Sequence, residues 1–371
     1  MTVLDDVNLH RTELKTDTYT TTISDLLGMY SRHDLCVNPE YQRLFRWDLA
    51  RQSEYIESLL LNIPTPPLFF ATNPDGKSEV IDGLQRLSTL IKFFSPEVVK
   101  DASLATAENN ENEQNNIHVG TMLCKTPLVG SLEGFTIKTL PETLVRTLRY
   151  TRIPVILLEK ESSRKARFHV FKRLNRSGSV LSEQEIRNCS ARLFGNEFPE
   201  ALKDLASHRS IGMALGLPKE QARKMGVEEC ILRLLANVYS PTPFQHSVIE
   251  FLDDFMEYAS EGNFKIDGVV VAKIDRCFEH LAHIFPDGES FRFWRNNKPI
   301  NSFSTNLFDI VSYGVFTNID YIESQPEFTK SKIIGMHDGD VLADYVGSGT
   351  NTRKKYLGRL ELGKSWFNPV N

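Results

Sequence analysis

The chain has no apolar run of the roughly 18–20 residues that a helix needs to cross a bilayer. Its first residues, Met1 to Asp6, lack the basic and apolar stretches that together mark a secretion signal. The five cysteines are scattered, odd in number and without a C-x-x-C pair, which favours reduced thiols over a disulfide framework. We therefore expect a soluble protein of the cytoplasm that does not contact a membrane.

The chain of 371 residues also lacks an excess of positive charge, since 43 Lys and Arg against 48 Asp and Glu give a net charge of −5. This balance excludes a polybasic nucleic-acid binder, and a hydrophobic content of 41% excludes a wholly disordered chain. Residues 144–192 nevertheless hold twelve Lys or Arg and only four Glu. Such a band can bind phosphate groups or can be a solvated helix surface, and the sequence favours neither interpretation.

Hydrophobic spacing and turn residues predict the elements of the N-terminal half. The expected elements are a helix over residues 48–63 capped by Asp48, a hairpin of residues 68–71 and 79–81, a helix over residues 85–94, a strand over residues 153–158, a basic helix from Ser162 or Ser163 to Leu174, and a helix opened by a capping box at Ser182. Residues 101–118 are rich in Asn and Glu and predict a flexible insertion. Beyond these elements, the pattern to about residue 322 is mostly helical.

Two motifs have simpler interpretations than their patterns suggest. Residues 358–365 satisfy the P-loop pattern, but a P-loop needs a strand before it and a helix after it, and only six residues follow Ser365. Cys277, His280 and His283 have the spacing of one helix face, but a zinc site needs a fourth ligand, and no residue nearby in the sequence supplies it. We therefore predict neither a P-loop nor a protein-built metal site.

The run Asp82-Gly83-Leu84-Gln85-Arg86 follows the predicted hairpin and opens the next helix. A glycine lets the backbone turn sharply, and the free amides at a helix start favour an anion. Arg86 adds a planar fork that can bind phosphate through two hydrogen bonds. Asp82 could hold a metal ion, a ribose hydroxyl or Arg86 itself. The plainer interpretation is a buried Asp–Arg pair that closes the turn from strand to helix.

Three segments together resemble the GmrSD-type N-terminal domain family, which has a ParB/sulfiredoxin-like fold. They are Val37-Asn38-Pro39-Glu40-Tyr41-Gln42-Arg43-Leu44-Phe45-Arg46-Trp47, Ile81-Asp82-Gly83-Leu84-Gln85-Arg86-Leu87-Ser88-Thr89-Leu90, and residues 171–188 with Phe171-Lys172-Arg173-Leu174-Asn175 and Leu181-Ser182-Glu183-Gln184-Glu185. The resemblance predicts an α+β fold. We expect a ParB/sulfiredoxin-like domain over residues 20–195, a mainly α-helical domain over residues 196–325 and a C-terminal tail over residues 326–371.

The resemblance also implies binding and hydrolysis of a nucleoside triphosphate, with Mg²⁺, in the control of restriction of foreign DNA. It assigns catalytic roles to Asp82, Gln85 and Arg86, and nucleotide binding to Gln42, Arg43, Gly83, Arg173, Asn175 and Gln184. The catalytic base stays unassigned, with Asp82 and Glu40 as candidates. Leu84 stands where the family usually has Gln, which puts hydrolysis in doubt but not binding.

The chain has no recognisable nuclease domain, so we expect DNA cleavage to need a separate nuclease or effector subunit. Two alternatives stay open. The first is a module that binds DNA without turnover and shows a steep salt dependence. The second is a scaffold that only binds a partner protein.

Overall fold

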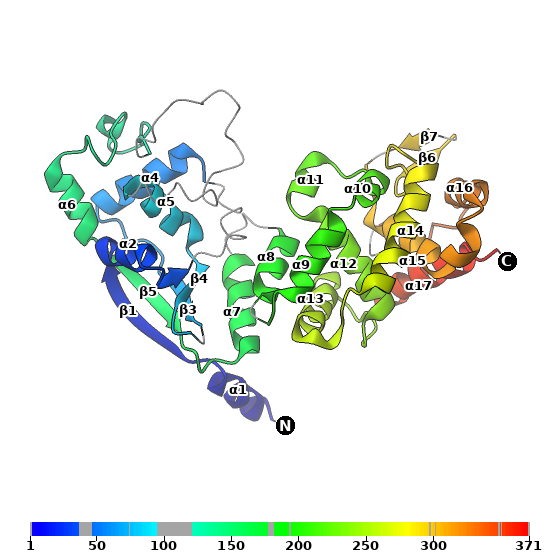
Figure 1. Cartoon of the computed structure of the whole chain (residues 1–371), viewed down its shortest axis with the longest axis horizontal. Coiled ribbons are helices and arrows are strands. Elements are labelled where there is room, and N and C mark those ends of the chain that lie inside the picture. Colours follow the sequence, from blue (N-terminus) through cyan, green and yellow to red (C-terminus); the bar gives the residue numbers. More distant parts are fainter. Residues whose placement is uncertain are drawn as a thin grey trace. The chain divides into compact units, whose positions relative to one another are not determined.

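The computed structural model describes residues 2–36, 47–73, 75–94, 121–176, 182–192, 194–296, 298–300, 302–347, 349 and 351–369 (Figure 1). The chain divides into two compact units, residues 1–180 and 181–371, and each has its own hydrophobic core. The flexible insertion expected over residues 101–118 lies outside the described residues. The domain boundaries expected from the sequence stay a prediction.

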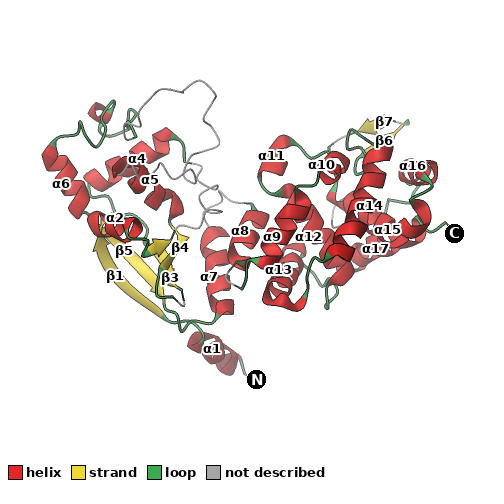
Figure 2. Ribbon diagram, in the orientation of Figure 1, coloured by secondary structure: helices red, strands yellow, loops and turns green. Residues whose placement is uncertain are grey.

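A five-stranded mixed sheet forms the centre of the first unit (Figure 2). Its strands are β1 (Thr16–Thr22), β2 (Leu35–Cys36), β3 (Leu68–Thr72), β4 (Ser78–Asp82) and β5 (Arg152–Leu158), in the order β1-β5-β3-β4-β2. Neighbours β1/β5 and β3/β4 are antiparallel, whereas β3/β5 and β2/β4 are parallel. The predicted hairpin is thus confirmed as β3 and β4.

The helices of this unit are α1 (Val3–Thr12), α2 (Ile23–Ser31), α4 (Leu49–Leu60), α5 (Leu84–Phe94), α6 (Glu142–Tyr150) and α7 (Arg164–Arg176), with a 3₁₀ turn at Gly130–Leu132. Helix α1 lies beyond the end of the sheet, and none of its described side chains belongs to the core (Figure 2). One core joins α2, α4, α5 and α6 to β3, β4 and β5 through side chains such as Leu26, Ile56, Leu90, Phe70 and Val155. Alternation along a strand directs Ile81 of β4 away from Val80, and α7 lies beside β4.

The predicted helix starts are confirmed by their hydrogen bonds. The Asp48 carboxylate accepts from Arg51 N at 2.8 Å, and Ser163 Oγ accepts from Ala166 N at 3.0 Å. The guanidinium of Arg167 donates to the carbonyls of Thr72 and Glu159, both at 2.8 Å, so α7 is tied to the ends of β3 and β5. These contacts fix α7 on the sheet.

The turn from β4 into α5 depends on Gly83, whose φ is +96°. A Cβ atom there would collide with Leu68 of the neighbouring strand and would lie 3.2 Å from Nη2 of Arg86. Only glycine adopts this conformation without strain and leaves this space open. The chain can therefore pass directly from strand to helix with Asp82 and Arg86 on either side of the turn.

The second unit is mainly helical, as predicted (Figure 2). Its elements are α8 (Glu183–Ala191), α9 (Glu197–Ala206), α10 (Arg209–Leu215), α11 (Lys219–Arg223), α12 (Gly226–Tyr239), α13 (Val248–Tyr258), a π-helical turn (Ala259–Asn263), α14 (Gly268–Ile284), β6 (Phe293–Arg295), β7 (Lys298–Ile300), α15 (Thr305–Ile322), α16 (Pro326–Gly335) and α17 (Arg353–Trp366). The capping box at Ser182 opens α8 as the sequence predicts. None of the described helices is both long and apolar enough to cross a membrane.

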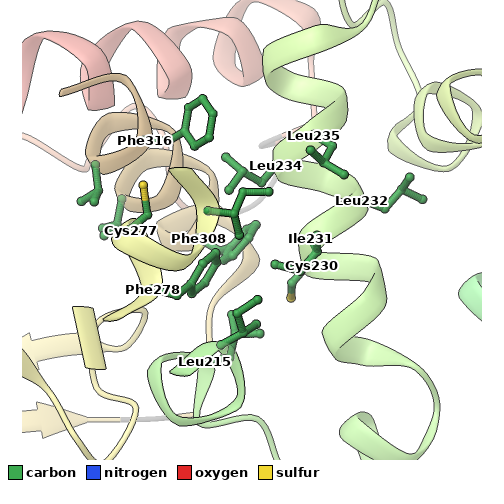
Figure 3. Close-up of a cluster of buried hydrophobic side chains, with 14 of the residues drawn as sticks. Leu215, Cys230, Ile231, Leu232, Leu234, Leu235, Cys277, Phe278, Phe308 and Phe316 are labelled. Atoms are coloured by element: carbon green, nitrogen blue, oxygen red, sulfur yellow. The ribbon is translucent and has the colours of Figure 1, made fainter. Parts of the chain in front are cut away.

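Two of these helices are buried on nearly all sides. Every residue of α12 from Cys230 to Ala236 is buried, and α15 is buried along most of its length. Figure 3 shows side chains of α12 such as Ile231 and Leu234 in one cluster with Phe278 of α14 and Phe308 of α15. A helix that is apolar all round belongs at the centre of a domain, so α12 and α15 form the centre of this unit.

The segment expected to be a C-terminal tail, residues 326–371, instead contains α16 and α17. Helix α17 packs closely along α15 because glycines meet at the contact. A Cβ atom at Gly363 would collide with the carbonyl oxygen of Ile310, and one at Gly314 with that of Gly363. The P-loop pattern of residues 358–365 therefore lies inside a packed helix, where Gly363 allows the close approach of α15 and Gly358 makes room for Tyr345.

A buried cluster of charges joins α12, α15 and α17. Asp309, with no exposed surface, accepts hydrogen bonds from Arg233 Nη2 at 2.7 Å and from Arg359 Nε at 3.1 Å. Tyr356 lies under both guanidinium groups, with its ring 5.5 Å from Arg233 and 4.8 Å from Arg359. One carboxylate thus compensates two buried cations.

We expect Asp309→Asn to destabilise the second unit strongly, since two buried guanidinium groups would lose their counter-charge. Breaking a buried ion pair by removing one partner costs about 3–5 kcal/mol. Denaturant unfolding, followed by circular dichroism, measures the loss. Asp320→Asn, which removes a carboxylate at the exposed Arg276 pair, is the control and should have little effect. Equal effects of the two substitutions would contradict this view of the cluster.

We expect Gly83→Ala to destabilise the first unit more than Gly76→Ala does. Both glycines have a positive φ, +96° and +84°, so both substitutions introduce backbone strain of about 1–3 kcal/mol. Only the Cβ at residue 83 also meets neighbouring atoms, since nothing lies within 4 Å at residue 76. Thermal unfolding of the two variants distinguishes the effect of backbone strain from that of the collision. If both variants lost the same thermal stability, the close packing at Gly83 would contribute nothing to stability.

Candidate functional site

The second motif places Asp82 and Arg86 in direct contact. Arg86 Nη2 lies 3.0 Å from Asp82 Oδ2, and Arg86 Nη1 donates to the carbonyl oxygen of Pro66. The Arg86 side chain is 11% exposed and the Asp82 side chain 31%, so the carboxylate is the more accessible partner. The plainer interpretation of the motif, an Asp–Arg pair that closes the turn, is therefore part of the structure.

Gln85 joins the second motif to the end of the first. Its side-chain oxygen accepts from the backbone N of Trp47 at 3.1 Å, and Gln52 of α4 donates to the carbonyl oxygen of Trp47 at 2.9 Å. Two amide side chains thus hold the backbone of one residue. This geometry makes Gln85 a positioning residue for the chain around Trp47, while the sequence gives it a catalytic role that stays a prediction.

Tyr55 lies beside this cluster and was not identified from the sequence. Its ring packs edge-on against Trp47 at 5.7 Å between centroids. Burial raises the pKa of Tyr55 to about 12, although the positive charge of Arg86 acts to lower this pKa. Within the described part of the chain its buried hydroxyl has no hydrogen-bond partner. The only sequence signal was that Gln52 and Tyr55 share, at i and i+3, a face of the predicted helix.

Two predicted nucleotide-binding residues lie on α7 of the same unit. Arg173 is exposed on the helix, and Asn175 belongs to its last turn, although its side chain lies outside the described residues. Gln42 and Arg43 lie outside the described residues, as does the candidate base Glu40. The structure therefore brings together Asp82, Gly83, Gln85 and Arg86.

Gln184 belongs to the second unit, where its side chain is fully buried. Its Nε2 donates to Asn188 Oδ1 at 2.7 Å, and its Oε1 accepts from Arg187, which also pairs with Asp253 at 2.8 Å. This network joins α8 to α13. Since both the nitrogen and the oxygen of the Gln184 amide form hydrogen bonds within this network, Gln184 stabilises the packing of α8.

Several basic side chains of residues 144–192 are held by partners within the chain. Arg167 and Arg187 are buried and are held by internal acceptors. Arg146 pairs with Glu142 at 3.1 Å on α6, and Arg192 lies 3.4 Å from Glu200. Arg167 and Arg187 therefore serve the fold and are not available to a phosphate group.

Residues that could hold a metal ion are sparse in the described chain. No group of three or more His, Cys, Asp or Glu side chains gathers there in a geometry suited to a metal. His280 bonds to Thr329 Oγ1 at 2.8 Å, and His283 is exposed. Asp82 is a partly exposed carboxylate beside Arg86, and one carboxylate suits a Mg²⁺ ion that is held mainly by phosphates.

Comparison with protein families gives one match. Residues 23–191 match the family model described as the GmrSD restriction endonuclease, N-terminal domain. No curated protein and no solved structure shows significant similarity to the chain. The match begins at the first residue of α2 and ends at the last residue of α8, so it contains all three of the motifs on which the predicted resemblance depends.

The match confirms that resemblance for this part of the chain. It includes the turn at Gly83, the Asp82–Arg86 pair and the Gln85 contact to Trp47. Residues 23–191 are a GmrSD-type N-terminal domain.

Proposed function

We propose that this chain is a nucleotide-binding component of a restriction-like or anti-phage defence system, with its nucleotide site at the second motif. The family match supports the restriction-like role. The ParB/sulfiredoxin-like fold expected for residues 20–195 belongs to the same proposal.

The observation that carries the nucleotide site is the turn at Gly83. It places a guanidinium and a carboxylate beside the first turn of α5, where backbone N–H groups and the helix dipole favour an anion. Arg86 is the natural partner of a phosphate group, since its fork can donate two parallel hydrogen bonds. Asp82 is suited to a cation that accompanies the phosphates or to a ribose hydroxyl.

Binding has better support than hydrolysis. Leu84 opens α5 and packs partly buried against the core of the first unit, so this position offers no polar group to orient a water molecule. We propose hydrolysis only as an activity that another residue or a partner subunit completes. DNA acts in the proposal as the signal or the target of the system, and a separate nuclease subunit cleaves it.

We expect Arg86→Ala to weaken binding of ATP or GTP in the presence of Mg²⁺ by about 10–100-fold. The loss corresponds to a hydrogen bond to a charged group, worth about 1.5–3 kcal/mol. Isothermal titration calorimetry on the full chain measures affinity, and phosphate release measures turnover.

Arg146→Ala is the matched control, because it removes the same charge from the same unit at an exposed pair. Arg86→Lys, which keeps the charge but not the fork, should give an intermediate affinity. Thermal unfolding confirms that each variant is folded. If the wild-type chain binds no nucleotide with or without DNA, the proposed site is wrong for the isolated protein.

A further inference from the structure

Both terminal nitrogens of Arg86 are already engaged in the free protein. Nη1 donates to the carbonyl oxygen of Pro66, and Nη2 bonds to Asp82 Oδ2 at 3.0 Å. These two bonds use two of the five N–H donors of the guanidinium, so a phosphate group that approached from the side of the more exposed Asp82 would compete with that carboxylate for Nη2.

The two acceptors differ in how easily they can leave. The carbonyl of Pro66 belongs to the backbone of the segment between α4 and β3, next to the sheet. The carboxylate of Asp82 is a side-chain group, and it is 31% exposed. Because the Arg86 side chain is only 11% exposed, loss of the carboxylate is favourable only when another anion takes its place.

The backbone around Asp82 holds this residue next to Arg86. Asp82 is the last residue of β4, and a Cβ atom at Gly83 would meet Leu68 and Arg86, so the turn is closely surrounded. A rotation of the Asp82 side chain alone removes the carboxylate from Arg86. The guanidinium meanwhile stays tethered to Pro66 and keeps its position.

We propose that Asp82 is an internal stand-in for the ligand, which occupies the phosphate position on Arg86 until an anionic group of the ligand displaces it. The inference rests on the proposed nucleotide function and adds that the Asp82 carboxylate competes with the ligand for Arg86. It accounts for an arginine that is paired in the free protein and still serves as an anion receptor. It also predicts that the removal of the Asp82 charge improves binding of the anion.

The test uses inorganic tripolyphosphate as the probe, in the presence of EDTA, so that no metal ion bridges the carboxylate and the phosphates. Full-length wild-type protein and Asp82→Asn are compared by calorimetry, since Asn keeps the shape and one acceptor oxygen. We expect Asp82→Asn to bind tripolyphosphate about threefold to tenfold more tightly than wild type.

Asp75→Asn is the matched control for the change of net charge. Asp75 lies in the turn between β3 and β4 with its side chain 58% exposed, and it pairs with Lys77 at 3.9 Å. We expect its affinity to stay within about twofold of wild type, because an exposed charge away from Arg86 is largely screened. If both variants gained the same affinity for tripolyphosphate, the gain would come from a general reduction in charge repulsion, and the proposed displacement of Asp82 would be wrong.

A second comparison tests whether Asp82 acts through Arg86. In an Arg86→Ala background, Asp82→Asn should give no gain in affinity for tripolyphosphate, because no guanidinium is present for Asp82 to occupy. A gain that persists in this background would overturn the inference, as would an unchanged or weaker affinity of Asp82→Asn alone. Thermal unfolding verifies that each variant is folded.

The two proposals can fail separately. If wild type binds, Arg86→Ala weakens binding and Asp82→Asn does not improve it, only the stand-in role of Asp82 is wrong. If neither wild type nor Asp82→Asn binds tripolyphosphate in EDTA, or ATP and GTP with Mg²⁺, the nucleotide site itself is wrong and the inference falls with it.

Discussion

The contact on which the first unit's candidate site depends is the pair of bonds that Arg86 makes to Asp82 and to the carbonyl of Pro66. These bonds join the end of β4, the start of α5 and the segment before β3. The contact is possible because Gly83 adopts a φ of +96° and leaves the space that a Cβ would fill. Gln85, which contacts Trp47, belongs to the helix that this turn opens.

Local sequence signals predicted this part of the fold well, because the elements depend on short-range chemistry. The cap at Asp48, the turn between β3 and β4 and the capping box at Ser182 are each determined by a few neighbouring residues. Strand β1 was not predicted, because its Thr-rich sequence lacks apolar alternation and it lies at the sheet edge beside β5. Such a strand is specified by its partner rather than by its own pattern.

The site was harder to predict, because residue type alone does not show which polar groups are used by the fold. Gln184 matches the family motif, yet Asn188 and Arg187 occupy both ends of its amide. The same holds for the buried Arg167 and Arg187 within the basic band. Tyr55 shows the opposite case, since its buried hydroxyl without a partner in the described chain gave no signal in the sequence.

The P-loop pattern in α17 and the Asp82–Arg86 pair show how packing separates a motif from a site. In α17 Gly363 is close-packed against α15 and Gly358 against Tyr345, and the backbone amides that would cradle phosphate stay within the helix. At Gly83 the close packing lies on the Leu68 side, while the Asp82 carboxylate stays 31% exposed. A phosphate that binds a group already in use needs either a free donor or a partner that can leave. That condition favours the exposed carboxylate of Asp82, which a side-chain rotation can move, over an amide that is fixed inside a helix.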